Sequence, residues 1–124
     1  MPVFTMADAR PFQLHGARFE SVVAPSAGSA ELCAWRTTVA PGTTGQPHIV
    51  NHEEVFLVLA GTPTMTLDGT PTRLAPGSVV FVPAGSSVRL DNDADEEAQL
   101  WVTTVVGLTA STPAGDRIVP PWTL

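Results

Sequence analysis

Short apolar runs separated by glycine and proline turns recur along the chain and predict a fold built from β-strands. The run at residues 55–60 ends at Gly61, and the run at residues 78–82 ends at Pro83. Apolar runs of this length between turn residues are typical of strands with a buried face. We expect strands over residues 11–14, 18–23, 31–39, 55–60, 64–67, 71–74, 78–82, 88–90 and 99–106.

A tight hairpin is predicted near the middle of the chain. Residues 64–67 alternate polar and apolar side chains, and Asp68-Gly69 follows directly. That dipeptide is a strong signal for a two-residue β-turn. No segment keeps a helical period over three turns. Regularly spaced strands without helices predict a single all-β domain over residues 1–124, either a sandwich or a barrel.

Composition and charge narrow the function classes. Of the 124 residues, 44% are hydrophobic and 15% are charged, which is the balance of a globular domain. The net charge is −6, and six arginines without any lysine form no basic patch, so we expect no nucleic-acid partner. We expect no membrane partner either, because no apolar run is long enough to span a bilayer. The N-terminus lacks the pattern of a signal peptide, which predicts a cytoplasmic protein.

Two segments resemble the paired motifs of the cupin family. The first, residues 41–61 (PGTTGQPHIVNHEEVFLVLAG), matches at His48, Glu54 and Gly61. The second, residues 77–92 (GSVVFVPAGSSVRLDN), matches at Gly77, Pro83, Gly85 and Asn92. The resemblance covers about residues 31–106. It implies a double-stranded β-helix, or jelly-roll, barrel with N-terminal strands at 11–23 and a C-terminal tail at 107–124.

The chain departs from the cupin pattern at two of the four positions where that family binds its metal. Val50 and Val88 stand where two of the family's three histidines are found, so only His48 and Glu54 remain. Two protein ligands hold a divalent transition metal weakly, since catalytic sites usually supply three. We therefore expect no cofactor. The two valines make the cavity drier and favour an apolar organic ligand.

One alternative restores a metal site. By strand parity, His52 shares a face with His48 and Glu54, and two histidines with one carboxylate form a known ligand set for one divalent transition metal. The protein would then be a metal-dependent cupin enzyme, an oxygenase or an isomerase. Related motifs place the corresponding histidine near a hairpin tip instead, where parity breaks.

Glu54 and His48 are the candidate catalytic residues if no metal is bound. Burial in an apolar barrel raises a carboxyl pKa towards neutrality, and a neighbouring His48 could share the proton. The predicted function is then a metal-independent isomerase, cyclase or lyase. A residual carboxylate that is hydrogen-bonded to His48 and inert is the competing interpretation of Glu54. The protein would in that case be a non-catalytic ligand-binding or sensing module.

Five apolar side chains are predicted to line the pocket for a small organic ligand, because they fall on expected strands or at the altered metal positions: Val50, Val88, Phe56, Trp35 and Trp101. We also expect a homodimer, since sheet edges need cover. The tail includes Pro120-Pro121-Trp122, and its tryptophan is expected to pack over this barrel or against a second subunit.

Overall fold

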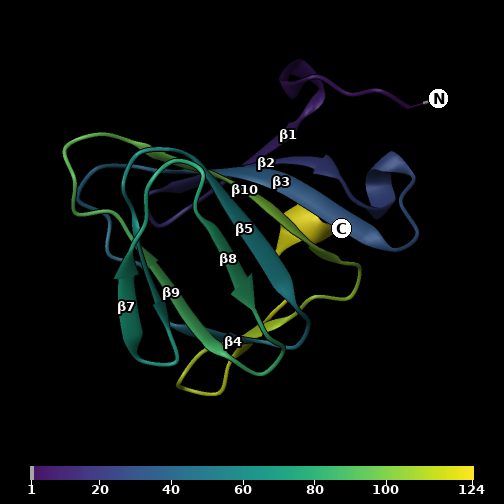
Figure 1. Cartoon of the computed structure of the whole chain (residues 1–124). Coiled ribbons are helices and arrows are strands. Elements are labelled where there is room, and N and C mark those ends of the chain that lie inside the picture. The colour runs from purple at the N-terminus through teal and green to yellow at the C-terminus, as the bar shows by residue number, and fades with distance from the viewer. Residues whose placement is uncertain (1) are drawn as a thin grey trace.

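Two six-stranded antiparallel sheets face each other and form a barrel (Figure 1). This arrangement comes from a computed structural model, which describes residues 2–124. The first sheet has the order β1 (Arg10–Leu14), β2 (Ala17–Val23), β3 (Leu32–Val39), β10 (Ala98–Val105), β5 (Glu54–Ala60) and β8 (Val79–Val82). The second has the order β12 (Arg117–Ile118), β11 (Ala110–Ser111), β4 (His48–Val50), β9 (Ser87–Asp91), β6 (Thr64–Leu67) and β7 (Thr70–Arg73). The all-β jelly-roll prediction is confirmed.

The hairpin between β6 and β7 turns at the expected dipeptide. Asp68 and Gly69 have φ angles of 48° and 84°. Positive φ at both central residues is the geometry that matches the twist of paired strands, and it suits aspartate and glycine. β6 and β7 pair from Thr64 opposite Arg73 to Leu67 opposite Thr70.

The core lies between the two sheets and consists of the inward-facing residues of each strand. Along β10, residues alternate between buried and half-buried, and Leu100 and Val102 are both 0% exposed. Met65 on β6 and Val82 on β8 contribute from other strands. A period of two is what a strand with one buried face requires.

The tail packs over the molecule's own barrel, the first of the two predicted positions. It ends in a 3-10 helix, η3 (Pro121–Thr123). The Trp122 ring stacks on Phe19 of β2, with centroids 3.7 Å apart and ring planes inclined by 2°. The Ser21 hydroxyl donates a hydrogen bond of 2.7 Å to the Trp122 carbonyl. The tail therefore closes the inner face of the N-terminal strands.

Within residues 2–124, no helix has the length and apolar character needed to cross a membrane.

Candidate functional site

Glu54 is the buried carboxyl of the barrel interior. It is the first residue of β5, pairs with Val82 of β8, and is 3% exposed. Phe56 and Val58 follow at alternate positions and are buried on the same face. Glu54 points inward because it occupies the same alternate positions of β5 as Phe56 and Val58.

Burial raises the pKa of Glu54 to about 7, and no ion pair or hydrogen bond offsets this effect. Among residues 2–124, the buried side-chain polar atoms that are sealed off without a partner are Thr38 Oγ1 and Trp122 Nε1. The Glu54 oxygens are not in that group, so they keep a small contact with solvent. Near neutral pH, this carboxyl populates both protonation states, as a general acid or base must.

His48 lies on the opposite sheet, and its tautomer is set by a backbone contact. Nδ1 is 3.2 Å from the Gln46 carbonyl oxygen, which can only accept, so Nδ1 carries the hydrogen and Nε2 keeps a lone pair. Burial lowers the pKa of His48, and the Gln46 contact raises it by less. The imidazole is therefore neutral near pH 7.

The expected hydrogen bond between His48 and Glu54 is not made in the part of the chain that the structure describes. Neither residue contributes to the other's pKa shift. Burial causes the shift at Glu54, and burial together with the Gln46 contact causes the shift at His48. The two groups belong to facing sheets, β4 in one and β5 in the other.

The valines at the altered metal positions lie beside His48. Val88 pairs directly with His48 across β4 and β9, and Val50 is two residues along β4 on the same face. Val50 and Val88 are 1% and 2% exposed. Phe56 and Trp35 also face inward, each opposite Val102 of β10. These four predicted pocket residues belong to one apolar cluster.

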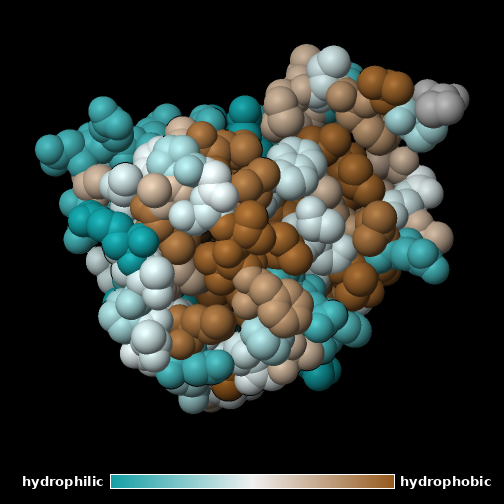
Figure 2. Space-filling view, viewed as in Figure 1, coloured by the Kyte–Doolittle hydropathy of each residue, from teal (hydrophilic) through white to brown (hydrophobic). Residues whose placement is uncertain are grey.

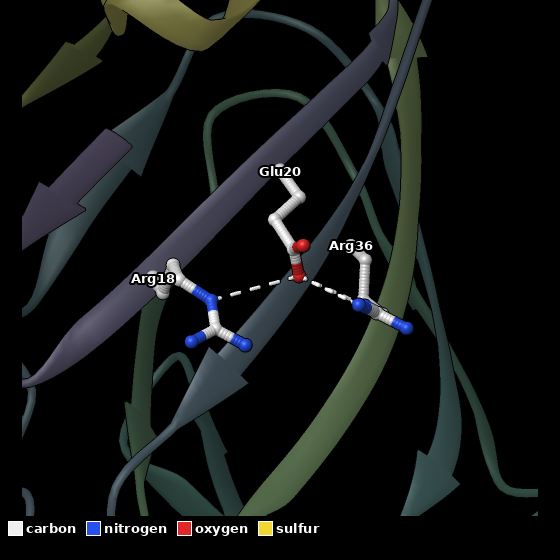
Figure 3. Close-up of polar contacts among 3 residues, drawn as sticks. All are labelled: Arg18, Glu20 and Arg36. Carbon is white, nitrogen blue, oxygen red and sulfur yellow. Dashed lines mark hydrogen bonds and ion pairs between the residues drawn. The ribbon is translucent and has the colours of Figure 1, made fainter. Parts of the chain in front are cut away.

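The prediction that Trp101 lies in the core and lines the pocket is wrong. Trp101 pairs with Arg36 on one side and Leu57 on the other. Its neighbours Leu100 and Val102 are fully buried, so Trp101 points to the outer face. Arg36 points outward with it. Both Arg36 nitrogens that contact Glu20 lie within 3.0 Å of one carboxylate oxygen, and Arg18 Nε is 3.7 Å from the same atom (Figure 3).

The ligand set His48, His52 and Glu54 does not converge. The described residues contain no group of three or more histidine, cysteine, aspartate or glutamate side chains that could hold a metal ion. The chain bends at Asn51 and His52 as it passes from the second sheet to the first, so parity does not carry across. His52 Nε2 lies instead beside Gly107, 3.6 Å from where a Cβ there would stand. These residues do not fit a cupin metal.

Thr104 is a site residue that the sequence analysis missed. It is 3% exposed, and the register of β10 with β5 sets it beside Glu54. Its hydroxyl donates a 2.8 Å hydrogen bond to the Glu53 carbonyl, which holds the start of β5. Strand periodicity could have identified it, because every second residue of β10 faces inward: Ala98, Leu100, Val102 and Thr104.

Two hollows lie elsewhere on the surface. One, of about 230 Å³, is lined by residues that include Thr43, Arg89 and Asp91, and Arg89 forms an ion pair of 2.8 Å with Asp91 there. The other, of about 380 Å³, is lined by residues that include His15, Arg18 and Glu97. Neither includes Glu54 or His48, so they are separate from the candidate site.

Solved structures with the same fold include enzymes of several kinds. The polyketide cyclase RemF from Streptomyces resistomycificus superposes with a TM-score of 0.77 at 16% identity, over 85% of this chain and 79% of that chain. KdgF from Halomonas sp. gives 0.74 at 18% identity, over 85% and 93%. A sugar phosphate isomerase of a cupin superfamily from Silicibacter pomeroyi gives 0.73 at 14% identity, over 96% and 93%. At these identities, the likeness shows the fold alone.

No curated protein matches the chain. The family profile described as "Cupin domain" matches residues 35–106, a span that includes β4, β5, β8 and β9 and thus both motifs. Because this match covers more than half of the 124 residues, the protein belongs to the cupin family.

Proposed function

We propose that the protein binds a small apolar organic molecule between its two sheets and catalyses a proton-transfer reaction on it. The reaction class is isomerisation, cyclisation or elimination, and it uses no metal. The observation that carries the proposal is Glu54, a carboxyl 3% exposed, without a compensating partner, whose pKa burial raises to about 7. Such a group in a family of ligand-binding barrels is a candidate acid or base.

Glu54 is the acid and His48 is the base in this proposal. Burial favours the neutral form of both, so the reactive form of the site, populated near and below pH 7, holds a carboxylic acid and an imidazole with a free Nε2. His48 Nε2 removes a proton from a carbon next to a substrate carbonyl, and the C–H electron pair becomes a C=C bond. Glu54 gives its proton to the carbonyl oxygen at the same time. In a substrate with a double bond one carbon further along, protonated His48 then gives its proton to the far end of the dienol. The enol O–H returns its proton to Glu54 as the C=O bond re-forms, so the double bond has moved and both groups are restored.

The substrate class follows from the lining. Val50, Val88 and Phe56 present aliphatic and aromatic carbon, and no charged side chain from residues 2–124 besides the Glu54 carboxylate belongs to the buried set. An anionic substrate would therefore lose its hydration without a compensating cation. A neutral carbonyl compound fits better, since it needs only the two hydrogen-bonding groups. The fold also hosts a polyketide cyclase and a sugar phosphate isomerase, which agrees with chemistry of this kind without fixing a substrate.

Deuterium incorporation tests the proton transfer directly. Cyclohexanone and acetophenone are incubated with the protein in D₂O, and loss of the proton signal next to the carbonyl is followed by NMR. We expect exchange above the buffer rate, abolished in Glu54→Gln and retained in Glu53→Gln, whose side chain is exposed. Equal exchange in Glu54→Gln would remove Glu54 from the mechanism. Saturable binding without exchange would show a passive binding module instead.

Metal analysis tests the second part of the proposal, that the reaction uses no metal. Protein purified without chelators is expected to hold no stoichiometric transition metal, because residues 2–124 supply no third ligand. One metal ion per chain that disappears in His48→Ala would overturn the metal-free proposal.

A further inference from the structure

The outer face of the first sheet divides into an apolar part and a polar part. Exposed apolar side chains gather over β5 and β8 (Figure 2), where Val79 and Phe81 are 63% and 52% exposed. The polar part lies across β1, β2 and β3 and includes the ion pairs of Figure 3. The surface hollow of about 380 Å³ lies at one end of this polar part, beside the turn between β1 and β2. Its volume is in the range of ligand pockets, about 300–1,000 Å³.

Three hydrogen-bonding residues of this hollow stand in one row across the strands. Gln13 of β1 pairs with Arg18 of β2, which pairs with Thr38 of β3. Directly paired residues point to the same face and have Cβ atoms about 5 Å apart. The row faces outward, because Phe19 and Val39, the next residues of β2 and β3, face the inside. An amide, a guanidinium and a hydroxyl are therefore neighbours on one surface.

Arg18 contributes a positive charge that the protein does not neutralise. Glu20 accepts hydrogen bonds from Arg36 Nε at 3.0 Å and Nη2 at 2.9 Å, so Arg36 already balances its charge. Arg18 approaches the same carboxylate oxygen only through Nε, at 3.7 Å. Its two terminal nitrogens are turned away from Glu20 (Figure 3), and residues 2–124 give them no hydrogen-bond acceptor. A guanidinium with such a free fork binds a carboxylate through two parallel hydrogen bonds.

Glu97 lines the same hollow and carries a negative charge without a partner. It directly precedes β10, and its side chain is exposed. The ion pairs made within residues 2–124 join Glu97 neither to Arg18 nor to His15, although both of these also line the hollow. Opposite charges around one hollow that do not pair with each other are complementary to a molecule that carries both charges.

Thr38 adds a polar group that lacks a partner. The residue is 3% exposed, and its hydroxyl makes no hydrogen bond within the described chain, residues 2–124. A buried hydroxyl without a partner is unfavourable, so an acceptor supplied by a bound molecule would stabilise it. Rotation about the Cα–Cβ bond of this outward side chain moves the hydroxyl from its sealed position to another staggered position. This observation points to a ligand independently of the charges.

We propose that the hollow binds a small zwitterion of the amino-acid class. The ligand's carboxylate accepts hydrogen bonds from the Arg18 guanidinium and the Thr38 hydroxyl, and its ammonium group lies at Glu97. Because the Arg18 side chain is 43% exposed, water screens the charges, and we expect a dissociation constant of about 1 mM. The proposal is independent of the proposed function, since the hollow includes neither Glu54 nor His48.

A chemical-shift titration of the isotope-labelled full chain with four probes tests the proposal. Glycine and γ-aminobutyrate are a short and a long zwitterion, whereas butyrate and butylamine each carry one of the two charges. We expect saturable shifts of the Arg18 and Thr38 amides with at least one zwitterion. Its affinity is expected to be about fivefold above that of butyrate or butylamine, because each of these loses one exposed ion pair.

Removal of either protein charge should remove the preference for the zwitterion. Arg18→Gln and Glu97→Gln are each expected to weaken zwitterion binding about fivefold. Thr38→Val keeps the shape of the side chain without its hydroxyl, and it should also weaken binding. The matched controls are Arg117→Gln and Glu96→Gln, which remove the same charges at exposed positions outside the hollow and should leave the affinity unchanged.

The proposal is overturned if neither zwitterion shifts these amides, or if butyrate binds as tightly as the zwitterions. A folded Arg18→Gln variant with wild-type affinity would exclude the assigned carboxylate contact. An equal loss in Arg117→Gln or Glu96→Gln would show a long-range effect of net charge in place of a site.

Discussion

His48 and Val88 lie directly opposite each other across the β4–β9 ladder. Paired residues of an antiparallel ladder have Cβ atoms about 5 Å apart and point to the same face. Val88 therefore fills the space in which a second imidazole would converge with that of His48. The family resemblance and the register lead independently to this position, so one substitution tests whether the barrel still holds the geometry of a metal site.

Val88→His is expected to create zinc or cobalt binding. The variant would have two facing imidazoles and the Glu54 carboxylate, which is the ligand number of a catalytic site. We expect affinity for Zn²⁺ to rise at least about tenfold over the wild type by isothermal titration calorimetry, which corresponds to about 1.4 kcal/mol. Ile49→His, on β4 next to His48 but 46% exposed, is the control. Affinity in Val88→His no higher than in this control would contradict the predicted convergence.

Glu54→Gln is expected to stabilise the protein above neutral pH. The folded-state pKa is raised from 4.5 to about 7, so the folded state binds more protons than the unfolded state between these values. Stability therefore falls as pH rises through that window, by about 3 kcal/mol for a shift of this size. Glutamine cannot ionise and avoids the loss.

The measurement is urea denaturation of wild type and variant across the titration range. Above pH 7, Glu54→Gln should have the larger free energy of unfolding, and the difference should vanish near pH 4.5. Glu53→Gln, at the exposed neighbouring position, should show no such pH-dependent difference. A constant difference across the window would contradict the raised pKa.

Trp122→Ala should destabilise the fold by about 3–5 kcal/mol, the usual loss for a large buried aromatic. The indole stacks on Phe19 at 3.7 Å and lies edge-on to Trp35 at 6.4 Å, so its removal leaves a cavity in the core. Trp122→Phe keeps a stacked ring and removes a buried N–H that has no acceptor, so its loss should be smaller. Thermal unfolding of the two variants gives the comparison. Equal stabilities would argue that the stacking contributes little.

Asn92→Ala should cost about 3 kcal/mol, because three hydrogen bonds disappear from a fully buried position. Asn92 Nδ2 donates to the Val39 and Glu96 carbonyls at 3.1 and 2.8 Å, and Oδ1 accepts from the Ala94 N–H at 3.2 Å. Asn51→Ala is the matched control, since Asn51 also makes backbone bonds but at the exposed surface. Chemical denaturation should show the smaller loss for Asn51→Ala. The reverse order would contradict the burial argument.

Local patterns in the sequence were sufficient to predict most of the fold. The run at 64–67 with Asp68-Gly69 fixes both a strand and its turn, because the turn chemistry and the alternation agree. The short strands β4, β11 and β12 were not predicted. Each has two or three residues, and such strands exist through their partners, as when Ala110 pairs with both Val50 and Ile118. Pairing between distant segments leaves no local signal.

The candidate site was only partly predictable for a related reason. Alternation within a strand placed Glu54 and Phe56 inward correctly. Trp101 was predicted wrongly because it falls on an expected strand, and membership of a strand does not say which face a residue occupies. His52 depended on parity continuing through a bend, which periodicity cannot detect. The contact between Nδ1 of His48 and the Gln46 carbonyl depends on loop geometry, which has no sequence signature.

The hydrogen bond from Ser21 to the Trp122 carbonyl joins residues 101 positions apart, and this separation affects how the protein is made. The N-terminal strands leave the ribosome first, with Phe12 and Phe19 on a face that Trp122 later covers. That aromatic face stays open to water until residue 122 has emerged. Exposed apolar surface on a nascent chain is what chaperones bind and what leads to aggregation. Completion of the core is therefore a late event that follows translation of the tail.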